Sequence, residues 1–245
     1  MLCAPFFKDF SVRMAHPTIL IYGIFMSYQH QFSDGIPFNH PLGKVVCVGR
    51  NYAEHAKELN NPIPSTPILF IKPATAVSSF SDVIHLPHDL GECHYEAELA
   101  VLIGKQLTKA APKDIDDAIA GYGLALDLTL RTVQSELKAK AHPWEIAKSF
   151  DGSCPLSSFV QPSELKDCSD IEFQFKINNE LRQHGKTSDM ITAIKPLVAY
   201  ISQYFTLMPG DVVLTGTPAG VGLLESGMTL EASLEAVLKV ESETK

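Results

Sequence analysis

The sequence lacks the features that mark several large classes of protein. Its 245 residues include only five cysteines with no Cys-x-x-Cys pair, so neither a disulfide framework nor a structural zinc site is expected. It has no cluster of lysine and arginine, and 20 basic against 28 acidic residues leave a net charge of −8, which argues against nucleic-acid binding. No apolar run approaches the roughly 20 residues that span a bilayer. We therefore expect a reduced, cytoplasmic protein whose partners are neither nucleic acids nor membranes.

What the sequence does contain is a series of short β-branched and aromatic runs separated by glycine, proline and aspartate. A content of 45% hydrophobic residues suits one sizeable globular domain. Strands and helices do not alternate regularly, which disfavours a parallel βαβ sheet. The pattern predicts an α+β, strand-rich fold with a mixed sheet. The expected strands are Lys44–Gly49, Ile68–Ile71, Glu98–Ile103, Ala120–Leu126, Ile171–Asn178 and Val212–Thr215.

Two helices and one hairpin are also expected. The helices run over Arg131–Lys140 and over about Asp189–Tyr204, the latter with Ser188 as its N-cap. The strand Ile171–Asn178 alternates strictly and should have one wet face, and Asn178–Arg182 should turn it into a second strand. The apolar face of the second helix would be formed by Ile191, Ile194, Leu197, Val198 and Ile201.

The N-terminus resembles neither a complete signal peptide nor part of the fold. Lys8 and Arg13 precede a short apolar stretch over 17–25, and no small-residue cleavage site follows it. We predict that Met26 is the natural start and that residues 1–25 are a leader or a misassigned start. Intact-mass analysis of protein from its native source tests this, because retention of residues 1–25 would contradict it.

Three carboxylates occupy apolar runs that have the character of buried strands. Glu96 and Glu98 lie at i and i+2, on one face of a strand. Both faces of that strand are apolar beyond the glutamates, and Asp127 interrupts a second apolar run. Converging buried carboxylates require a neutralising cation, and an all-oxygen ligand set favours Mg²⁺ or Mn²⁺ over zinc. The alternative is a solvated edge strand, which the spacing of the glutamates alone would favour.

Further candidates are less specific. His55 and Glu58 at i and i+3 share a face of a short helix and could form a general base, although a solvated turn is the simpler interpretation. Lys72 and Lys148 could offset surplus negative charge or simply extend to solvent. The segment 215–222 is either a plain turn or a set of backbone and hydroxyl donors for an anion.

Taken together, these motifs resemble the fumarylacetoacetate hydrolase family, in particular its acylpyruvase and oxaloacetate decarboxylase branch. The resemblance extends from about Lys44 to Val240. It is carried in order by VCVGRNYAEHAKE (46–58), YEAEL (95–99), LDLTLRTVQ (126–134), Trp144 with AKSFD (147–151), and LTGTPAGVG (214–222).

The resemblance implies a mixed β-sandwich roll with a few short helices, assembled as a homodimer. On this basis residues 26–43 form an N-terminal lead-in, and residues 44–242 form a single catalytic domain with a lid at about 52–66. It also implies site roles: Mg²⁺ or Mn²⁺ on Glu96, Glu98 and Asp127, a catalytic His55–Glu58 dyad with Lys148 beside the reacting enolate, and substrate contacts from Arg50, Lys72, Gln134 and Thr217.

The activity implied is hydrolysis of the C–C bond of 3-acylpyruvates to pyruvate and a carboxylic acid. Oxaloacetate decarboxylation would share the site, because both reactions pass through pyruvate enolate. The substrate would be a small 2-oxo acid or 1,3-diketo acid. Two alternatives stay open: a hydratase or isomerase of 2-oxo acids from aromatic catabolism, and a catalytically silent metal-binding protein of the same fold.

Overall fold

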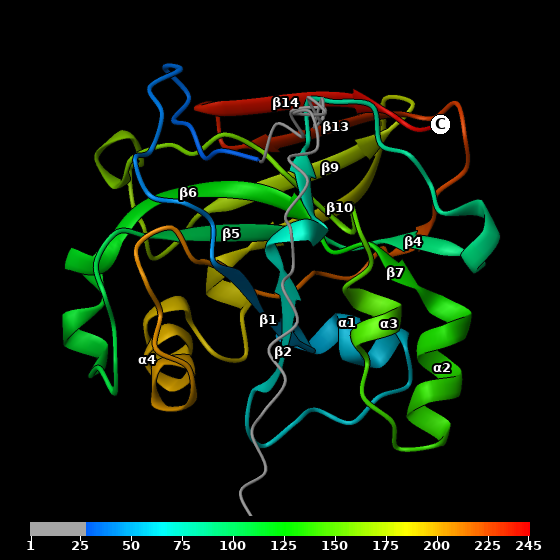
Figure 1. Cartoon of the computed structure of the whole chain (residues 1–245), viewed down its shortest axis with the longest axis horizontal. Coiled ribbons are helices and arrows are strands. Elements are labelled where there is room, and N and C mark those ends of the chain that lie inside the picture. Colours follow the sequence, from blue (N-terminus) through cyan, green and yellow to red (C-terminus); the bar gives the residue numbers. More distant parts are fainter. Residues whose placement is uncertain (1–27) are drawn as a thin grey trace, which may run out of the picture.

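The computed structural model describes residues 28–245, and the predicted leader over 1–25 lies outside them. The described chain folds into three curled β-sheets with four short α-helices (Figure 1). The largest sheet is mixed, because β1–β11 and β3–β8 pair parallel and its other pairs are antiparallel. Its order is β2 (Ile68–Pro73), β1 (Lys44–Gly49), β11 (Val212–Leu214), β5 (Ala97–Ile103), β6 (Ile119–Leu126), β8 (Cys154–Leu156) and β3 (Val77–Ser79).

Two smaller sheets and the helices complete the fold, so the predicted strand-rich α+β class is confirmed. The second sheet is β10 (Glu180–Lys186), β9 (Glu172–Ile177), β13 (Thr229–Leu234) and β14 (Leu238–Glu243). The third is β12 (Gly222–Leu223), β4 (Cys93–Tyr95) and β7 (Thr129–Leu130). The α-helices are α1 (Ala53–Glu58), α2 (Arg131–Ala139), α3 (Glu145–Lys148) and α4 (Ile194–Tyr204), and three-residue 3-10 helices begin at Ala74, His88, Pro112, Asp116, Pro162 and Thr187.

Strand β5 is buried on both faces, as its sequence predicts. All seven of its residues are buried. Leu99 and Val101 face the main core, whereas Ala100 and Leu102 face a second apolar cluster on the other side of the sheet. A strand covered on both sides has no wet face, so any carboxylate at its end is held in a dry environment.

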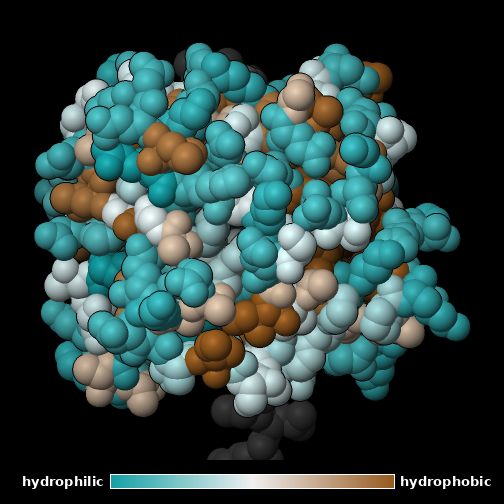
Figure 2. All heavy atoms as spheres, turned by 180° about the vertical axis from the view of Figure 1, so that it is seen from behind, coloured by the Kyte–Doolittle hydropathy of each residue, from teal (hydrophilic) through white to brown (hydrophobic). Residues whose placement is uncertain are grey.

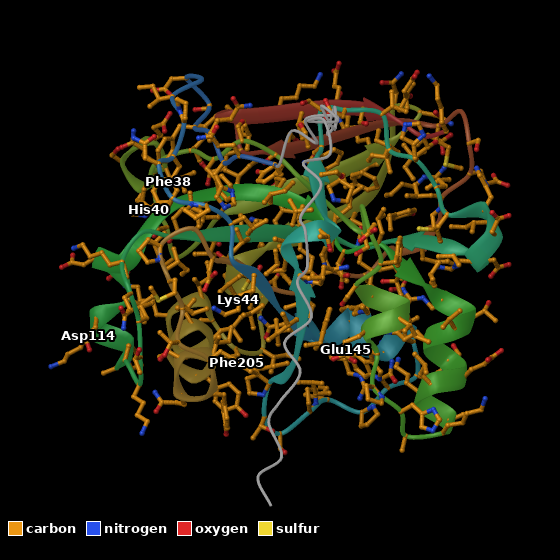
Figure 3. All side chains as sticks on the ribbon, viewed as in Figure 1. Phe38, His40, Lys44, Asp114, Glu145 and Phe205 are labelled. Carbon is orange, nitrogen blue, oxygen red and sulfur yellow. The ribbon has the colours of Figure 1, made fainter. Side chains whose placement is uncertain are left out.

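The lead-in covers this second face of the large sheet. Phe32 pairs with Phe159, and the ring of His30 is fully buried with Nε2 2.8 Å from the Gly210 carbonyl oxygen. The rings of Phe38 and His40, neighbours in Figure 3, have centroids 5.2 Å apart. The described part of the lead-in is therefore packed onto the sheet.

The predicted alternation and hairpin in the second sheet are confirmed. Strand β9 alternates half-buried and buried residues. It pairs antiparallel with β10 through a turn in which Asn178 and Asn179 have φ of 51° and 65°. Positive φ at both central positions gives the turn that matches strand twist, and asparagine tolerates it well.

The start predicted for the last helix is wrong. Helix α4 begins at Ile194 and not at Asp189, and Ser188 lies in a 3-10 helix instead of capping it. Asn51 captures the intervening segment: its carbonyl accepts the N–H of Ile191, and its Oδ1 accepts the N–H of Thr192, both at 2.8 Å. Ile191 is accordingly 40% exposed, while the other predicted apolar positions of the helix are buried.

Helices α1, α2 and α3 gather to the right of β1 and β2 in Figure 1, and α4 lies to their left. The reverse face of the molecule is mostly hydrophilic, with apolar side chains in small separate groups (Figure 2). Within the described range, no helix combines the length and apolarity needed to cross a membrane. The side with three helices is where the predicted site residues meet.

Candidate metal centre and active site

The β5–β6 register brings the three predicted carboxylates together. Ala97 pairs with Leu126, and one step beyond, the N–H of Asp127 donates to the carbonyl of Glu96 at 2.8 Å. Glu98 lies two residues further along the strand, on the face of Glu96. One oxygen from each carboxylate lies within 4.8 Å of those of the other two, and all three residues are at most 5% exposed. We call Glu96, Glu98 and Asp127 the carboxylate triad.

Two members of the triad are already paired with cations. Lys148 Nζ lies 2.8 Å from Glu96 Oε2 and 2.6 Å from Asp127 Oδ2. Arg131 Nη2 lies 2.5 Å from the other oxygen of Glu96. Burial alone would raise the pKa of Glu96, but the charges of Lys148 and Arg131, with His55, hold that pKa below its usual range. Burial likewise opposes the charge of Lys148, yet Asp127 and Glu96 raise its pKa.

Glu98 differs from its neighbours because no cation contacts it within residues 28–245. Its Oε2 accepts the N–H of Gly216 at 2.6 Å. Burial, followed by the charges of Asp127 and Glu96, raises the pKa of Glu98 well above its ordinary value. Gly216 has φ of +95°, and a Cβ there would lie 2.7 Å from that of Asn51, so glycine is required where the backbone meets this carboxylate.

The triad suits a hard divalent cation. Asp127 Oδ1 is buried and, within the described chain, accepts no aligned hydrogen bond, although Lys72 Nζ lies 2.9 Å away. Internal lysines already balance much of the triad's charge, so charge alone does not demand a metal. The uncompensated Glu98 and the unsatisfied oxygen of Asp127 do indicate one, and carboxylate oxygens are the ligands that Mg²⁺ and Mn²⁺ prefer.

Magnesium binding is expected to release protons from the triad, because metal ligands must be deprotonated. Burial and the charges of Asp127 and Glu96 raise the pKa of Glu98, so protons compete with the ion at this carboxylate. The affinity for Mg²⁺ should therefore increase with pH. Calorimetric titrations in two buffers of different ionisation enthalpy measure the released proton, and identical heats in both buffers would contradict the assignment.

The predicted dyad lies on α1, above the triad. His55 Nδ1 is 3.3 Å from Glu58 Oε2, and His55 is only 5% exposed. Glu58 Oε1 in turn accepts the N–H of Gly220 at 3.0 Å. Glu58 thus connects α1 to the glycine-rich segment 215–222 through Gly220, and its other oxygen faces the imidazole of His55. With Nδ1 facing Glu58, Nε2 is the nitrogen that can exchange a proton in the pocket.

One pocket, with a cavity volume of about 30 Å³, is lined by His55 of the dyad and by all three carboxylates of the triad. Of the predicted substrate contacts, Arg50, Gln134 and Thr217 line it. The Thr217 hydroxyl donates to the carbonyl of Ala97 at 2.8 Å, so its proton is already used.

Lys72 does not line this pocket. It is fully buried behind Asp127, and its ammonium lies 3.0 Å from the Ser153 carbonyl and also contacts the carbonyl of Lys148. The predicted substrate contact has no support in this placement. Lys72 instead forms a buried ion pair with Asp127.

Two cations that line the pocket were missed as site residues. Arg131 and Lys138 share a helical face with Gln134, at positions i, i+7 and i+3 of α2. The predicted helix Arg131–Lys140 contains that spacing. Helical periodicity alone would therefore have placed Arg131 and Lys138 on the same face as Gln134, which was predicted to contact the substrate.

Comparison with known proteins gives consistent matches. The family described as "Fumarylacetoacetate (FAA) hydrolase C-terminal" matches residues 44–243. Oxaloacetate tautomerase YcgM of Escherichia coli (strain K12) is 50% identical over 209 residues, covering 85% of this chain and 95% of that protein. A fumarylacetoacetate hydrolase family protein from Yersinia pestis CO92 superimposes with a TM-score of 0.87 at 48% identity, covering 89% of this chain and all of the other.

A more distant solved structure adds chemical information. Fumarylpyruvate hydrolase from Pseudomonas aeruginosa, in complex with Mn²⁺ and pyruvate, superimposes with a TM-score of 0.82. It is 31% identical, and the match covers 89% of this chain and 95% of that one. Two of these relatives are thus enzymes named for 2-oxo acids, oxaloacetate and fumarylpyruvate, and one of them is in complex with a divalent metal.

Proposed function

Because the chain belongs to the fumarylacetoacetate hydrolase family, we propose that it is a metal-dependent enzyme that interconverts the keto and enol forms of oxaloacetate. The observation that carries this proposal is the position of His55, which lines one pocket with the carboxylate triad and Lys148 while its Nδ1 faces Glu58. The sequence alone favoured C–C bond hydrolysis and kept isomerisation as an alternative. The names of the relatives reverse that order.

The triad would hold Mg²⁺ or Mn²⁺, with the 2-oxo-carboxylate end of the substrate beside it. A bound divalent cation would stabilise negative charge that develops on the oxygen at carbon 2. Lys148, which bonds Glu96 and Asp127, adds a fixed positive charge in the same dry environment. Arg131 donates to Gln134 Oε1 at 2.8 Å, which leaves the Gln134 amide N–H group free to donate to a substrate oxygen.

The proton transfer falls to the dyad. His55 removes the proton from carbon 3 of the keto form, and Glu58 stabilises the imidazolium that results. The electron pair of that C–H bond forms the double bond between carbons 2 and 3, and the π pair of the C2=O bond moves to the oxygen. That oxygen takes a proton from the His55 imidazolium to give the enol, and His55 returns to its neutral form. In the reverse direction His55 returns its proton to carbon 3. Helix α1 must move to admit substrate, since a cavity of about 30 Å³ holds little more than water.

A second candidate activity passes through pyruvate enolate, whose charge the same groups would stabilise, and is favoured by the Mn²⁺–pyruvate complex of the Pseudomonas relative. Water activated by His55 would attack the distal carbonyl of a 3-acylpyruvate, the C–C bond would break, and the products would be a carboxylic acid and pyruvate. Decarboxylation of oxaloacetate reaches the enolate by loss of CO₂ and needs no water. We further propose residues 44–242 as the catalytic domain of a cytoplasmic homodimer, with 52–66 as its lid.

The experiment that separates these activities supplies Mg²⁺ with oxaloacetate or acetylpyruvate in parallel. Ultraviolet absorbance follows the enol, and a coupled assay follows pyruvate, with Glu96→Gln as the inactive control. Faster equilibration of the enol without pyruvate establishes the tautomerase. Pyruvate and acetate from acetylpyruvate establish the hydrolase, and the absence of both would contradict the proposal.

Replacement of His55 by alanine is expected to lower tautomerisation and acylpyruvate hydrolysis by roughly 10²–10⁴-fold, because both need the general base. Any oxaloacetate decarboxylation should persist, because it requires no proton abstraction and no water. Parallel rate measurements on the two substrates test this split. His85→Ala, at an exposed histidine, is the matched control. Equal loss of every activity would contradict the assigned role.

A further inference from the structure

Two cations in the pocket have no partner of their own. Arg50 and Lys138 both line it, and both are half-buried. Across residues 28–245 neither side chain forms an ion pair or a hydrogen bond with the protein. Lys148 and Arg131, by contrast, are bonded to the triad. The pocket is thus lined by the triad with its bonded cations and by two cations without such bonds, Arg50 and Lys138, which we call the cationic end.

The cationic end is held in place by its surroundings. Lys138 projects from the last turn of α2, and its Nζ lies 5.4 Å from the centre of the Trp144 ring. Arg50 follows β1 with φ of 63°, a conformation that turns the chain at the pocket wall. The Trp144 ring holds the Lys138 ammonium more firmly than a surface lysine is held, and the positive φ of Arg50 sets the direction of the backbone from which its side chain extends.

Like charges brought together in a half-buried place oppose one another. Burial, followed by the charges of Arg50 and Arg131, lowers the pKa of Lys138 to about 8. Glu96 attracts Lys138, and Lys148 adds to the repulsion. An anion bound at this end would relieve the repulsion and restore the lost solvation. The pocket lining carries four Arg and Lys side chains against three carboxylates, so its charge favours an anionic ligand before any metal binds.

We propose that Lys138, together with Arg50, binds the second carboxylate of a dianionic 2-oxo acid, and that Lys138 thereby makes the pocket selective for diacids over monoacids of equal length. The inference rests on the proposed function for one point, that the 2-oxo-carboxylate end of the substrate lies at the triad. It concerns the distal carboxylate, for which neither the dyad nor the triad supplies a cation.

The test compares two unreactive 2-oxo acids that differ only in the distal group. Isothermal titration of the Mg²⁺-loaded protein with 2-oxoglutarate and with 2-oxopentanoate measures the selectivity directly. For Lys138→Met, we expect binding of 2-oxoglutarate to weaken by about tenfold or more, as for loss of a charge-assisted hydrogen bond. Binding of 2-oxopentanoate should change by less than about twofold, since its methyl end needs no cation.

Two further variants make the outcome decisive. Lys138→Arg should retain the selectivity, because it keeps the charge. Lys140→Met removes an exposed lysine two residues further on and should leave both affinities unchanged. Equal weakening of both acids by Lys138→Met, or no weakening of either, overturns the proposal. So does wild-type protein that fails to distinguish the two acids.

The ratio of the two affinities should also depend on pH. With a pKa of about 8 in the free protein, Lys138 is charged below that pH and loses its proton above it. The preference for 2-oxoglutarate should therefore fall between about pH 7 and about pH 9, whereas in Lys138→Arg it should not, because arginine stays protonated. Groups whose titration changes both affinities equally do not alter the ratio of the two affinities. A wild-type ratio that stays constant over this range would overturn the assignment to Lys138.

Failure of this inference and failure of the proposed function give different results. Protein that prefers 2-oxoglutarate through Lys138 but leaves oxaloacetate untouched would retain the anion subsite and lose the tautomerase. Protein that turns over oxaloacetate with an unchanged KM in Lys138→Met would retain the activity and lose the subsite.

Discussion

Glu98→Gln is expected to abolish stabilisation by Mg²⁺ and to lower turnover by at least about 10³-fold, because a divalent ion supplies several kcal/mol of charge stabilisation. The folded metal-free protein should be unaffected. Glu98 is the triad member without a cationic partner in the described chain, and a glutamine oxygen can still accept the N–H of Gly216. The amide also has nearly the same shape as the carboxyl that it replaces, and it removes a charge from a position where burial raises the pKa of Glu98.

Melting curves with and without Mg²⁺, together with the oxaloacetate assay, measure both effects. Glu145→Gln is the matched control, because Glu145 is exposed on α3 (Figure 3) and does not line the pocket. Asp127→Asn should lose the metal as well, but it also removes a partner of Lys148 and Lys72 and so should destabilise the metal-free protein. A Glu98→Gln protein that still gains stability from Mg²⁺ would refute the assignment of the triad as the metal site.

Lys72→Met is expected to lower the free energy of unfolding by about 3–5 kcal/mol, the usual cost of leaving one member of a buried ion pair without its partner. Lys72 is fully buried, lies 2.9 Å from Asp127 Oδ1, and ties together the carbonyls of Lys148 and Ser153. Urea unfolding of the metal-free protein measures the loss. Lys195→Met is the comparison, because its ion pair with Asp116 is exposed and such pairs contribute little.

A double variant tests the physical cause. If the loss comes from the unpaired charge of Asp127, then Asp127→Asn in the Lys72→Met background should cost less than it does alone. If Lys72→Met leaves the stability unchanged and raises the KM, then Lys72 contacts the substrate directly, as the family resemblance implies.

The sequence predicts the parts of this site that follow from local pattern. Runs that are apolar on both faces are compatible only with buried strands, so β5 and β6 were found to within a residue or two, and the carboxylates within them stood out as costly. The periodicity of α2 was equally clear. These features need no knowledge of distant residues.

The errors come from contacts between distant segments. Asn51, about 140 residues away in the chain, takes the hydrogen bonds that would have begun α4 at Asp189. Whether Lys72 faces the pocket or the far side of Asp127 depends on the pairing of β2 with β1, which its own sequence does not reveal. The C-terminal hairpin of β13 and β14 was missed, because its short runs mix apolar residues with serine and glutamate.

The carboxylates and the cationic end belong to different parts of the framework, and this arrangement bears on how new specificities arise. The triad lies at the start of β5 and the end of β6, at the centre of the large sheet, where the neighbouring strands restrict any change. Arg50 and Lys138 come from a loop and a helix end at its margin. Substitutions at Arg50 and Lys138 can change which acid binds while the metal site is unaltered. A library randomised at those two positions should therefore yield variants with altered substrate ranges and intact metal affinity.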